Sequence, residues 1–310
     1  MSPRIVLEPK IDQHSDCLYR STDFLKNSIS FDALSNESFK SYDSDGFIVV
    51  KNIFTEDSIL KARKELEEMT YSIDPHCEAI YYEGAIRDYL SINKSDDRAS
   101  IEPTTSENLA LGQDLNKLPE IEINKRASFV RKFMGFIKNY PALKDLANNK
   151  HLASVIQRIL GEKGILFQDM AMIKPPSGRE KPWHQDHAYF DYPLTTKIVG
   201  VWIALNDTKP SNGCMHVITG GHLAGPRIHF MKRDWQICDI ELRNATCSAV
   251  PMRIGDTMFF DSKLPHGTPT NQTNHQRWAI QLHYTKCDSQ KSNPDNRLKI
   301  FGSEGKNVSC

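Results

Sequence analysis

The run KIVGVWIALND (197–207) indicates which fold class this chain of 310 residues adopts. Its β-branched and aromatic residues are typical of a β-strand. Short runs of the same kind lie on either side of it, at 164–173, 213–219, 253–262 and 277–285. Gly, Pro and Asn residues, which favour turns, separate these runs, and no long helical pattern comes between them. The sequence therefore predicts an antiparallel sandwich or barrel rather than a parallel α/β sheet.

The part of the chain before residue 163 has helical periodicity instead. Apolar residues recur near helical spacing over 54–73, with Thr55 placed to cap the N-terminus of the helix. The segment 127–161 is expected to form two or three short helices, interrupted at Pro141 and ended by a glycine. Residues 92–125 are polar and rich in Ser, Asn, Asp and Pro, so we expect a loop there.

Composition excludes several classes of protein. Acidic and basic residues balance at 39 each, so no global field favours nucleic acid, a membrane surface or a highly charged partner. No apolar run approaches the roughly 20 residues that span a bilayer, and the N-terminus lacks the apolar core of a signal peptide. The seven cysteines include no Cys-x-x-Cys pair, which argues against a disulfide framework or a cysteine-ligated zinc. We expect a cytoplasmic monomer or homodimer with reduced thiols.

The stretch WHQDHAY (183–189) carries two histidines and a carboxylate, His184, Asp186 and His187. A mononuclear iron centre needs two imidazoles and one carboxylate on one octahedral face, with three positions left open. On an extended strand His184 and Asp186 point to the same side, and His187 points away. His266, directly after an apolar strand, is the best candidate for the third ligand. Singly these residues are usually surface or structural features, so the prediction depends on their combination.

Arg277 opens the predicted strand 277–285 and follows His266 in the chain. A guanidinium there has the planar, two-donor geometry that clamps a carboxylate bound beside a metal. An arginine at the start of a strand is more often solvated. Its place downstream of the three candidate ligands favours the functional interpretation.

Several blocks, in order, resemble the phytanoyl-CoA dioxygenase family of Fe(II)/2-oxoglutarate oxygenases. They are MIKPP, WHQDHAYF, VGVWIALND, NGCMHVITGGH, IGDTMFF and PHGTPTNQTNHQRWAIQLHY, and the N-terminal FKSYDSDGFIVVKNIFTEDSI is also similar. The resemblance covers about residues 39–286. It implies an α+β protein with a mainly β core, a double-stranded β-helix of the jelly-roll or cupin-like type with packed N-terminal helices. We expect one domain over 1–310, with 39–162 mostly helical support, 163–286 the jelly-roll core, and 1–38 and 287–310 terminal extensions.

The resemblance also implies a function and a set of site residues. The enzyme would use Fe(II), 2-oxoglutarate and O2 to oxidise a C–H bond of a small molecule, with His184, Asp186 and His266 as iron ligands. The presence of Asp186 argues against a halogenase, in which a small residue replaces the carboxylate. The residues implied to bind 2-oxoglutarate are Arg277, Thr268, Trp202, Gln168, Met170 and Arg131, with Lys132 as the alternative to Arg131. Trp202 and Met170 fit an apolar core equally well.

Substrate recognition is expected in the segments 74–125 and 223–250 and directly after the metal motif, because loops on a rigid barrel carry recognition. The candidate substrate residues are Tyr189, Phe190, Arg227, His229 and Trp235, with Lys232 and Arg233 beside them. An acyl-coenzyme A, an amino acid, an alkaloid and a terpenoid all stay open as substrates. His216 and His222 are interpreted as structural residues of a hairpin, and Asp256 as a turn residue. A pseudoenzyme and a cupin-type enzyme without 2-oxoglutarate are the competing classes, and the triad with Arg277 argues against both.

Overall fold

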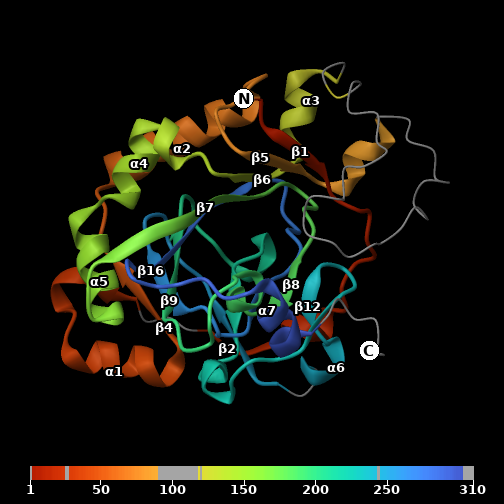
Figure 1. The fold of residues 1–310 in the computed structure, drawn as a ribbon. Helices are drawn as coiled ribbons and strands as arrows, with labels where there is room; N and C mark the ends of the chain where they lie inside the picture. Colours follow the sequence, from red (N-terminus) through yellow and green to blue (C-terminus); the bar gives the residue numbers. More distant parts are fainter. Residues whose placement is uncertain (1, 25–27, 90–117, 119–120, 243–244, 303–310) are drawn as a thin grey trace.

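The computed structural model describes residues 2–24, 28–89, 118, 121–242 and 245–302, in which two β-sheets carry the architecture (Figure 1). The major sheet has nine strands in the order β1 (Arg4–Leu7), β5 (Ala79–Tyr82), β6 (Val130–Met134), β7 (Gly164–Lys174), β16 (Arg277–Lys286), β9 (Ile198–Ala204), β14 (Thr257–Asp261), β4 (Phe47–Lys51) and β3 (Ile29–Ser30). The minor sheet has five, in the order β2 (Ser21–Phe24), β13 (Cys247–Val250), β10 (Met215–Val217), β15 (His266–Thr268) and β8 (Lys181–His184). A separate hairpin joins β11 (His229–Met231) to β12 (Trp235–Ile237).

The two sheets share one apolar core. Side chains from both sheets meet in it, among them Trp202, Met258 and Phe260 from the major sheet and Met215 and Val217 from the minor sheet. Neighbouring strands in the centre of each sheet are antiparallel. The α+β class with a mainly β, jelly-roll core is therefore confirmed.

Helices cover the other face of the major sheet, and Figure 1 shows them together on one side of it. They are α1 (Asn36–Asp45), α2 (Glu56–Tyr71), α4 (Pro141–Ala147) and α5 (Lys150–Leu160), while α3 (Ile123–Ala127), α6 (Asp239–Leu242) and α7 (Pro294–Phe301) lie elsewhere. The Thr55 hydroxyl accepts a hydrogen bond from the Ser58 amide and caps α2, as predicted. Pro141 opens α4, and Gly161 ends α5 with φ of 82°, a left-handed conformation that glycine adopts without strain.

The N-terminal half contains more β-structure than its periodicity suggested. Helices do occupy much of 39–162, but β4, β5 and β6 also lie in that range and belong to the major sheet. The segment 1–38 is likewise no loose extension, because β1 pairs with β5, β2 with β13 and β3 with β4. Most of the loop expected at 92–125 lies outside the described residues.

The cysteines and the helices bear on the expectations of reduced thiols and of no membrane-spanning segment. Cys17, Cys77, Cys214, Cys247 and Cys287 are free, as expected. Cys238 is disulfide-bonded, so the expectation of reduced thiols is wrong for that residue. Of the helices that the structure describes, none has the length and apolar character needed to cross a membrane.

Candidate metal centre

His184, Asp186 and His266 come together between the two sheets. β8 ends at His184, and β15 begins with His266 directly opposite it in the antiparallel pairing. One ligand atom from each of the three residues lies within 4.8 Å of the others, and all three residues are buried. The sequence predicted Asp186 on the same extended strand as His184. In the structure Asp186 instead begins the 3-10 helix η8 (Asp186–Tyr189), just beyond the end of that strand. The chain leaves the sheet at Gln185, whose amide donates to His229.

Backbone carbonyls orient both imidazoles. His184 Nδ1 lies 2.7 Å from the Pro182 carbonyl oxygen, and His266 Nδ1 lies 2.9 Å from that of Leu264. A carbonyl oxygen only accepts, so each Nδ1 carries the proton and each Nε2 keeps its lone pair. The two Nε2 atoms lie 3.2 Å and 3.6 Å from Asp186 Oδ1. Three unprotonated donor atoms therefore converge on one point.

The other carboxylate oxygen of Asp186 faces β16. Asp186 Oδ2 accepts hydrogen bonds from Gln281 Nε2 at 2.9 Å and from His283 Nε2 at 2.8 Å. Burial alone would raise the pKa of Asp186, but the neighbouring His266 and His283 and the hydrogen bond from His283 hold that pKa well below its usual range. Burial lowers the pKa of His266 to about 4. An ionised carboxylate with neutral imidazoles is the donor set that a divalent metal requires.

The remaining histidines lie outside this cluster. His187 is turned toward Ser262 Oγ at 3.0 Å and the Tyr192 carbonyl at 3.3 Å, which confirms that it points away. His216 packs edge-on against Tyr19, and its Nδ1 lies 3.1 Å from the Cys214 carbonyl. Burial lowers the pKa of His216 to about 4. Both rings are structural.

Arg277 lies in a small buried cavity without a carboxylate partner. Its guanidinium stands over the Trp202 ring at 5.2 Å, and its Nη1 donates a long hydrogen bond, of 3.4 Å, to the Met172 carbonyl oxygen. Nε is buried and makes no hydrogen bond, and no acidic group among the described residues forms an ion pair with this arginine. Burial lowers the pKa of Arg277 to about 10. A buried cation without a counter-ion is costly, so this cavity fits an anion.

Thr268 and Lys174 complete that cavity. Lys174 Nζ donates to the Thr268 hydroxyl at 2.9 Å and to the Thr268 and Pro269 carbonyls. The Thr268 oxygen already accepts from Lys174, so its own O–H is free to donate to a bound anion. Burial, followed by the charges of Arg277 and Arg131, holds the pKa of Lys174 well below its usual range.

The predicted residues on β6 and β7 are placed differently from one another. Arg131 lines the cavity and is held by Glu83 at 3.6 Å, Glu8 at 3.9 Å and the Glu180 carbonyl at 3.2 Å. Gln168 and Met170 lie farther along β7, opposite His283 and Gln281. The cavity-lining residues of β7 are Met172, Ile173 and Lys174, and Gln168 and Met170 are not among them.

Of the five candidate substrate residues, one lies at the metal centre with an exposed side. The Tyr189 ring stands edge-on to His184 at 5.6 Å, and its hydroxyl donates to the Trp235 carbonyl and accepts from Lys181. Phe190 is buried against His283 at 4.8 Å, inside the protein rather than along an open wall.

The three candidates from 223–250 are engaged within the protein. His229 accepts from the Gln185 amide through Nε2 and contacts the Arg227 carbonyl through Nδ1, so neither nitrogen is left for a substrate. Trp235 stacks on His229 and packs beside Ala188, and Arg227 pairs with Glu241 at 3.7 Å. His229 and Arg227 thus have polar partners inside the fold, while Trp235 is buried among aromatic and apolar side chains and its Nε1 makes no hydrogen bond.

Four residues of the site were missed in the sequence: Met172, Lys174, Gln281 and His283. For the last two a signal existed. Arg277, Gln281 and His283 alternate along one strand, and residues two apart share a face of a strand. For Lys174 no local signal exists, since its partner Thr268 is distant in the sequence.

Comparisons with known proteins agree with this geometry. Residues 42–279 match the family model described as phytanoyl-CoA dioxygenase (PhyH). The phytanoyl-CoA dioxygenase of Arabidopsis thaliana is 24% identical over 274 residues, which is 86% of this chain and 94% of that protein. The peroxisomal phytanoyl-CoA dioxygenase of Mus musculus is 27% identical over 305 residues, covering 93% of this chain and 79% of that protein.

Solved structures share the fold. EvdO2 from Micromonospora carbonacea var. aurantiaca, complexed with 2-oxoglutarate, has a TM-score of 0.60 at 20% identity and covers 87% of this chain and 98% of its own. EctD from S. alaskensis, with 2-oxoglutarate and 5-hydroxyectoine, has a TM-score of 0.58 at 21% identity and covers 96% of this chain and 86% of its own. The family model spans most of the sequence, and the chain therefore belongs to the phytanoyl-CoA dioxygenase family of Fe(II)/2-oxoglutarate-dependent oxygenases.

Proposed function

We propose that this chain is a dioxygenase that oxidises an unactivated C–H bond of a small molecule, with conversion of 2-oxoglutarate to succinate and CO2. One observation carries the proposal: a buried His-Asp-His cluster and an unpaired buried arginine lie in one barrel. The first fits a divalent metal, and the second fits the carboxylate of a co-substrate.

The residues fit Fe(II) by their chemistry. His184 and His266 would each offer Nε2, and Asp186 would offer Oδ1, because the other polar atoms of these side chains are already engaged in hydrogen bonds. When bound, iron and 2-oxoglutarate supply the oxidising power, drawn from O2, that no amino-acid side chain has. The protein contributes ligands of fixed orientation in a cluster that is almost closed to solvent.

Arg277 and Thr268 would hold 2-oxoglutarate at its distal carboxylate. The guanidinium offers a planar fork of N–H donors, and burial strengthens each hydrogen bond it makes. The Thr268 hydroxyl would donate alongside, since Lys174 occupies its oxygen. Trp202, beneath the guanidinium, fixes the plane of the arginine. Because Asp186 would supply a carboxylate ligand to the metal, oxygenation is favoured over halogenation.

The substrate would bind on the side of His184 where Tyr189 stands. Tyr189 and Lys181 present a phenol and an ammonium group there, and the ammonium group donates a hydrogen bond to the phenol oxygen. The names of the relatives support an acyl-coenzyme A as one alternative, and the structure of EctD with 5-hydroxyectoine supports another small metabolite.

Anaerobic titration with Fe(II) and 2-oxoglutarate tests the proposal. We expect a visible metal-to-ligand absorption band in the wild type, its loss in Asp186→Ala, and its retention in Asp256→Asn, a buried carboxylate that instead caps a turn at Arg253. Metal binding without a response to 2-oxoglutarate would favour a cupin-type enzyme, and no metal binding would favour a pseudoenzyme. Succinate release in the presence of candidate metabolites then identifies the substrate.

A further inference from the structure

Strand β16 presents two buried polar side chains to the candidate metal carboxylate. Gln281 and His283 are 5% and 0% exposed, and both contact Asp186 Oδ2, at 2.9 Å and 2.8 Å. The strand approaches Asp186 from the major sheet, whereas His184 and His266 belong to the minor sheet. Asp186 is thus held from one sheet and faces the histidines of the other.

The direction of these hydrogen bonds follows from the acceptor. An ionised carboxylate oxygen only accepts, so the Gln281 amide nitrogen and His283 Nε2–H are the donors. The two donors occupy Oδ2. Oδ1 remains for the cluster, 3.2 Å and 3.6 Å from the two histidine Nε2 atoms. Oδ2 therefore accepts the hydrogen bonds from β16, and Oδ1 faces the two histidines of the cluster.

The surroundings of His283 argue that packing alone does not explain this residue. Its ring packs beside Phe190 at 4.8 Å and Phe167 at 6.1 Å, and its Nδ1 is buried without a hydrogen-bond partner. An unsatisfied buried polar atom destabilises the fold. An apolar side chain of similar size, packed beside the two phenylalanines, would avoid that cost. The bond from Nε2 to Asp186 is what an apolar side chain could not supply.

We propose that Gln281 and His283 are positioning residues that restrict Asp186 to ligation through Oδ1 alone. A carboxylate that binds through both oxygens would occupy a second coordination position. With Oδ2 held by β16, the three residues use three positions and leave three for 2-oxoglutarate and O2. This inference rests on the proposed function, because it presupposes a metal at the cluster.

The test compares His283→Leu, His283→Gln and Gln281→Leu for Co(II) binding to the metal-free protein, followed by the visible spectrum of the Co(II) and Fe(II)·2-oxoglutarate complexes. We expect His283→Leu to weaken Co(II) binding about 10- to 100-fold, as when partners of metal ligands are removed elsewhere, and to change the Co(II) absorption. His283→Gln keeps a donor near the Nε2 position and should recover most of the affinity. Gln281→Leu should show the same spectral change with a smaller loss of affinity.

Thr285→Val is the matched control on the same strand. Thr285 is fully buried and its hydroxyl donates to the Lys197 carbonyl at 3.0 Å, but it does not touch Asp186. This variant should lose stability while its metal affinity and spectrum stay those of the wild type. If His283→Leu does not fold, Gln281→Leu decides, since it removes the other donor to Oδ2.

The failure of this inference differs from the failure of the proposed function. A wild type that binds neither Co(II) nor Fe(II) contradicts the metal site itself. A wild type that binds metal, with His283→Leu and Gln281→Leu matching its affinity within about 3-fold and its spectrum, overturns the positioning role alone. A loss of affinity that His283→Gln does not recover at all would also overturn it, because the donor would then not be the cause.

Discussion

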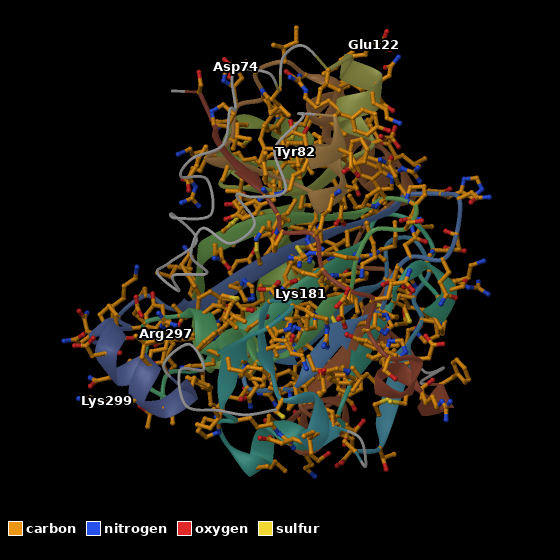
Figure 2. All side chains as sticks on the ribbon, turned by 90° about the vertical axis from the view of Figure 1, so that its right-hand side faces the viewer. Asp74, Tyr82, Glu122, Lys181, Arg297 and Lys299 are labelled. Carbon is orange, nitrogen blue, oxygen red and sulfur yellow. The ribbon has the colours of Figure 1, made fainter. Side chains whose placement is uncertain are left out.

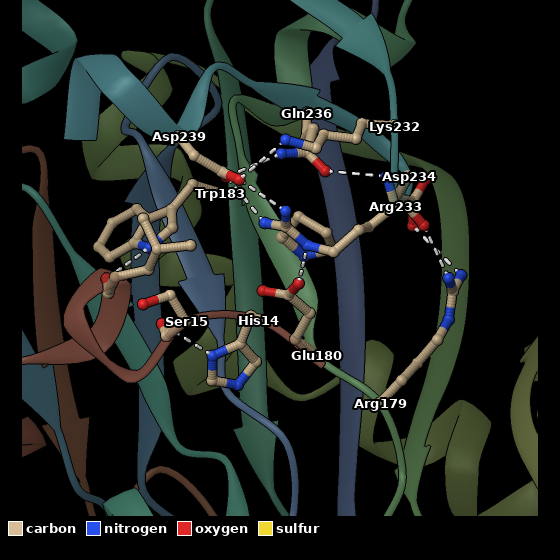
Figure 3. A network of polar contacts seen from close by, with 12 residues as sticks. His14, Ser15, Arg179, Glu180, Trp183, Lys232, Arg233, Asp234, Gln236 and Asp239 are labelled. Carbon is tan, nitrogen blue, oxygen red and sulfur yellow. Dashed lines mark hydrogen bonds and ion pairs between the residues drawn. The ribbon is translucent and has the colours of Figure 1, made fainter. Parts of the chain in front are cut away.

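Two arginines of this chain, the half-buried Arg233 and the buried Arg277, differ in one respect that separates structure from function. Arg233 lies in the hairpin between β11 and β12, where its Nη atoms donate to both oxygens of Asp239 at 2.6 Å and 2.8 Å and its Nε to Glu180 (Figure 3). Next to it Asp234 pairs with Arg179 and with Lys181. Every charge of this region has its opposite within the fold.

Arg277 is buried more deeply and has no such partner. Its Nε is unsatisfied, and Lys174, which lines the same cavity, is also a basic residue. Lys181, labelled near the centre of Figure 2, lies between the two regions: it pairs with Asp234 on one side and lines the cavity of Arg277 on the other. A charge that the chain neutralises itself supports the fold, and a buried charge that it leaves open marks the place of a ligand.

The largest effect is expected when the paired arginine is removed. Arg233→Met would leave the buried Glu180 and the half-buried Asp239 without the arginine that they share, so we expect a loss of about 3–5 kcal/mol in the free energy of unfolding. Urea unfolding followed by circular dichroism measures it. A loss below about 1 kcal/mol would mean that the network contributes no more than a surface ion pair, and the comparison would fail.

Arg277→Met should have the opposite profile. We expect the dissociation constant of 2-oxoglutarate to rise about 100-fold, in line with the 2–5 kcal/mol lost when one member of a buried charge pair is truncated. The unfolding free energy should stay the same or increase, because an unpaired buried cation is removed. Calorimetric titration of the Co(II) protein and urea unfolding give the two numbers. Strong destabilisation with unchanged 2-oxoglutarate binding would place Arg277 among the structural charges.

The smallest effect concerns pH and Lys132, whose Nζ stands over the Tyr81 ring at 3.8 Å. Burial lowers the pKa of Lys132 from 10.5 to about 8. The unfolded chain then holds the proton more tightly, so this lysine costs stability below pH about 8, and the cost is relieved as pH rises toward 10.5.

Lys132→Met should remove that alkaline gain, measured as urea midpoints across this pH range. Asp234 titrates in the opposite sense. Burial opposes its ionisation, but Lys181 and Arg179 hold its pKa well below the usual range, so its contribution is present at neutral pH and is lost as pH falls. If the stability of Lys132→Met still rises with pH over the alkaline range, a group other than Lys132 causes that rise.

The sequence predicts the C-terminal strands well for a physical reason. β7, β9 and β16 coincide within a few residues with the runs of β-branched and aromatic residues, because β9 and β16 are buried, β7 is partly buried, and turn residues bound all three. The N-terminal strands were missed because long-range pairing, such as that of β1 with β5, decides their conformation rather than local periodicity.

The site residues, too, divide into those that the sequence reveals and those that it does not. The metal motif and Arg277 are recognisable because their chemistry requires particular residue types at particular places. His229 was misjudged, since a histidine in a basic, aromatic segment resembles a ligand until its two hydrogen bonds are known. Lys174 could not be found from local pattern, because its burial and its contact with Thr268 depend on strands far away in the chain.

The position of β16 has a consequence for how the protein is made. It is the last strand that the structure describes, yet it lies in the middle of the major sheet, between β7 and β9. During synthesis β7 and β9 leave the ribosome before β16. Neither can form its pairing with β16 until that strand follows. Such non-local pairing folds slowly and exposes strand edges in the meantime. Arg277, Gln281 and His283 all arrive on that strand. These three residues join the ligand cluster only when the barrel closes, so a partly synthesised chain that ends before β16 lacks Arg277 and both donors to Asp186 Oδ2.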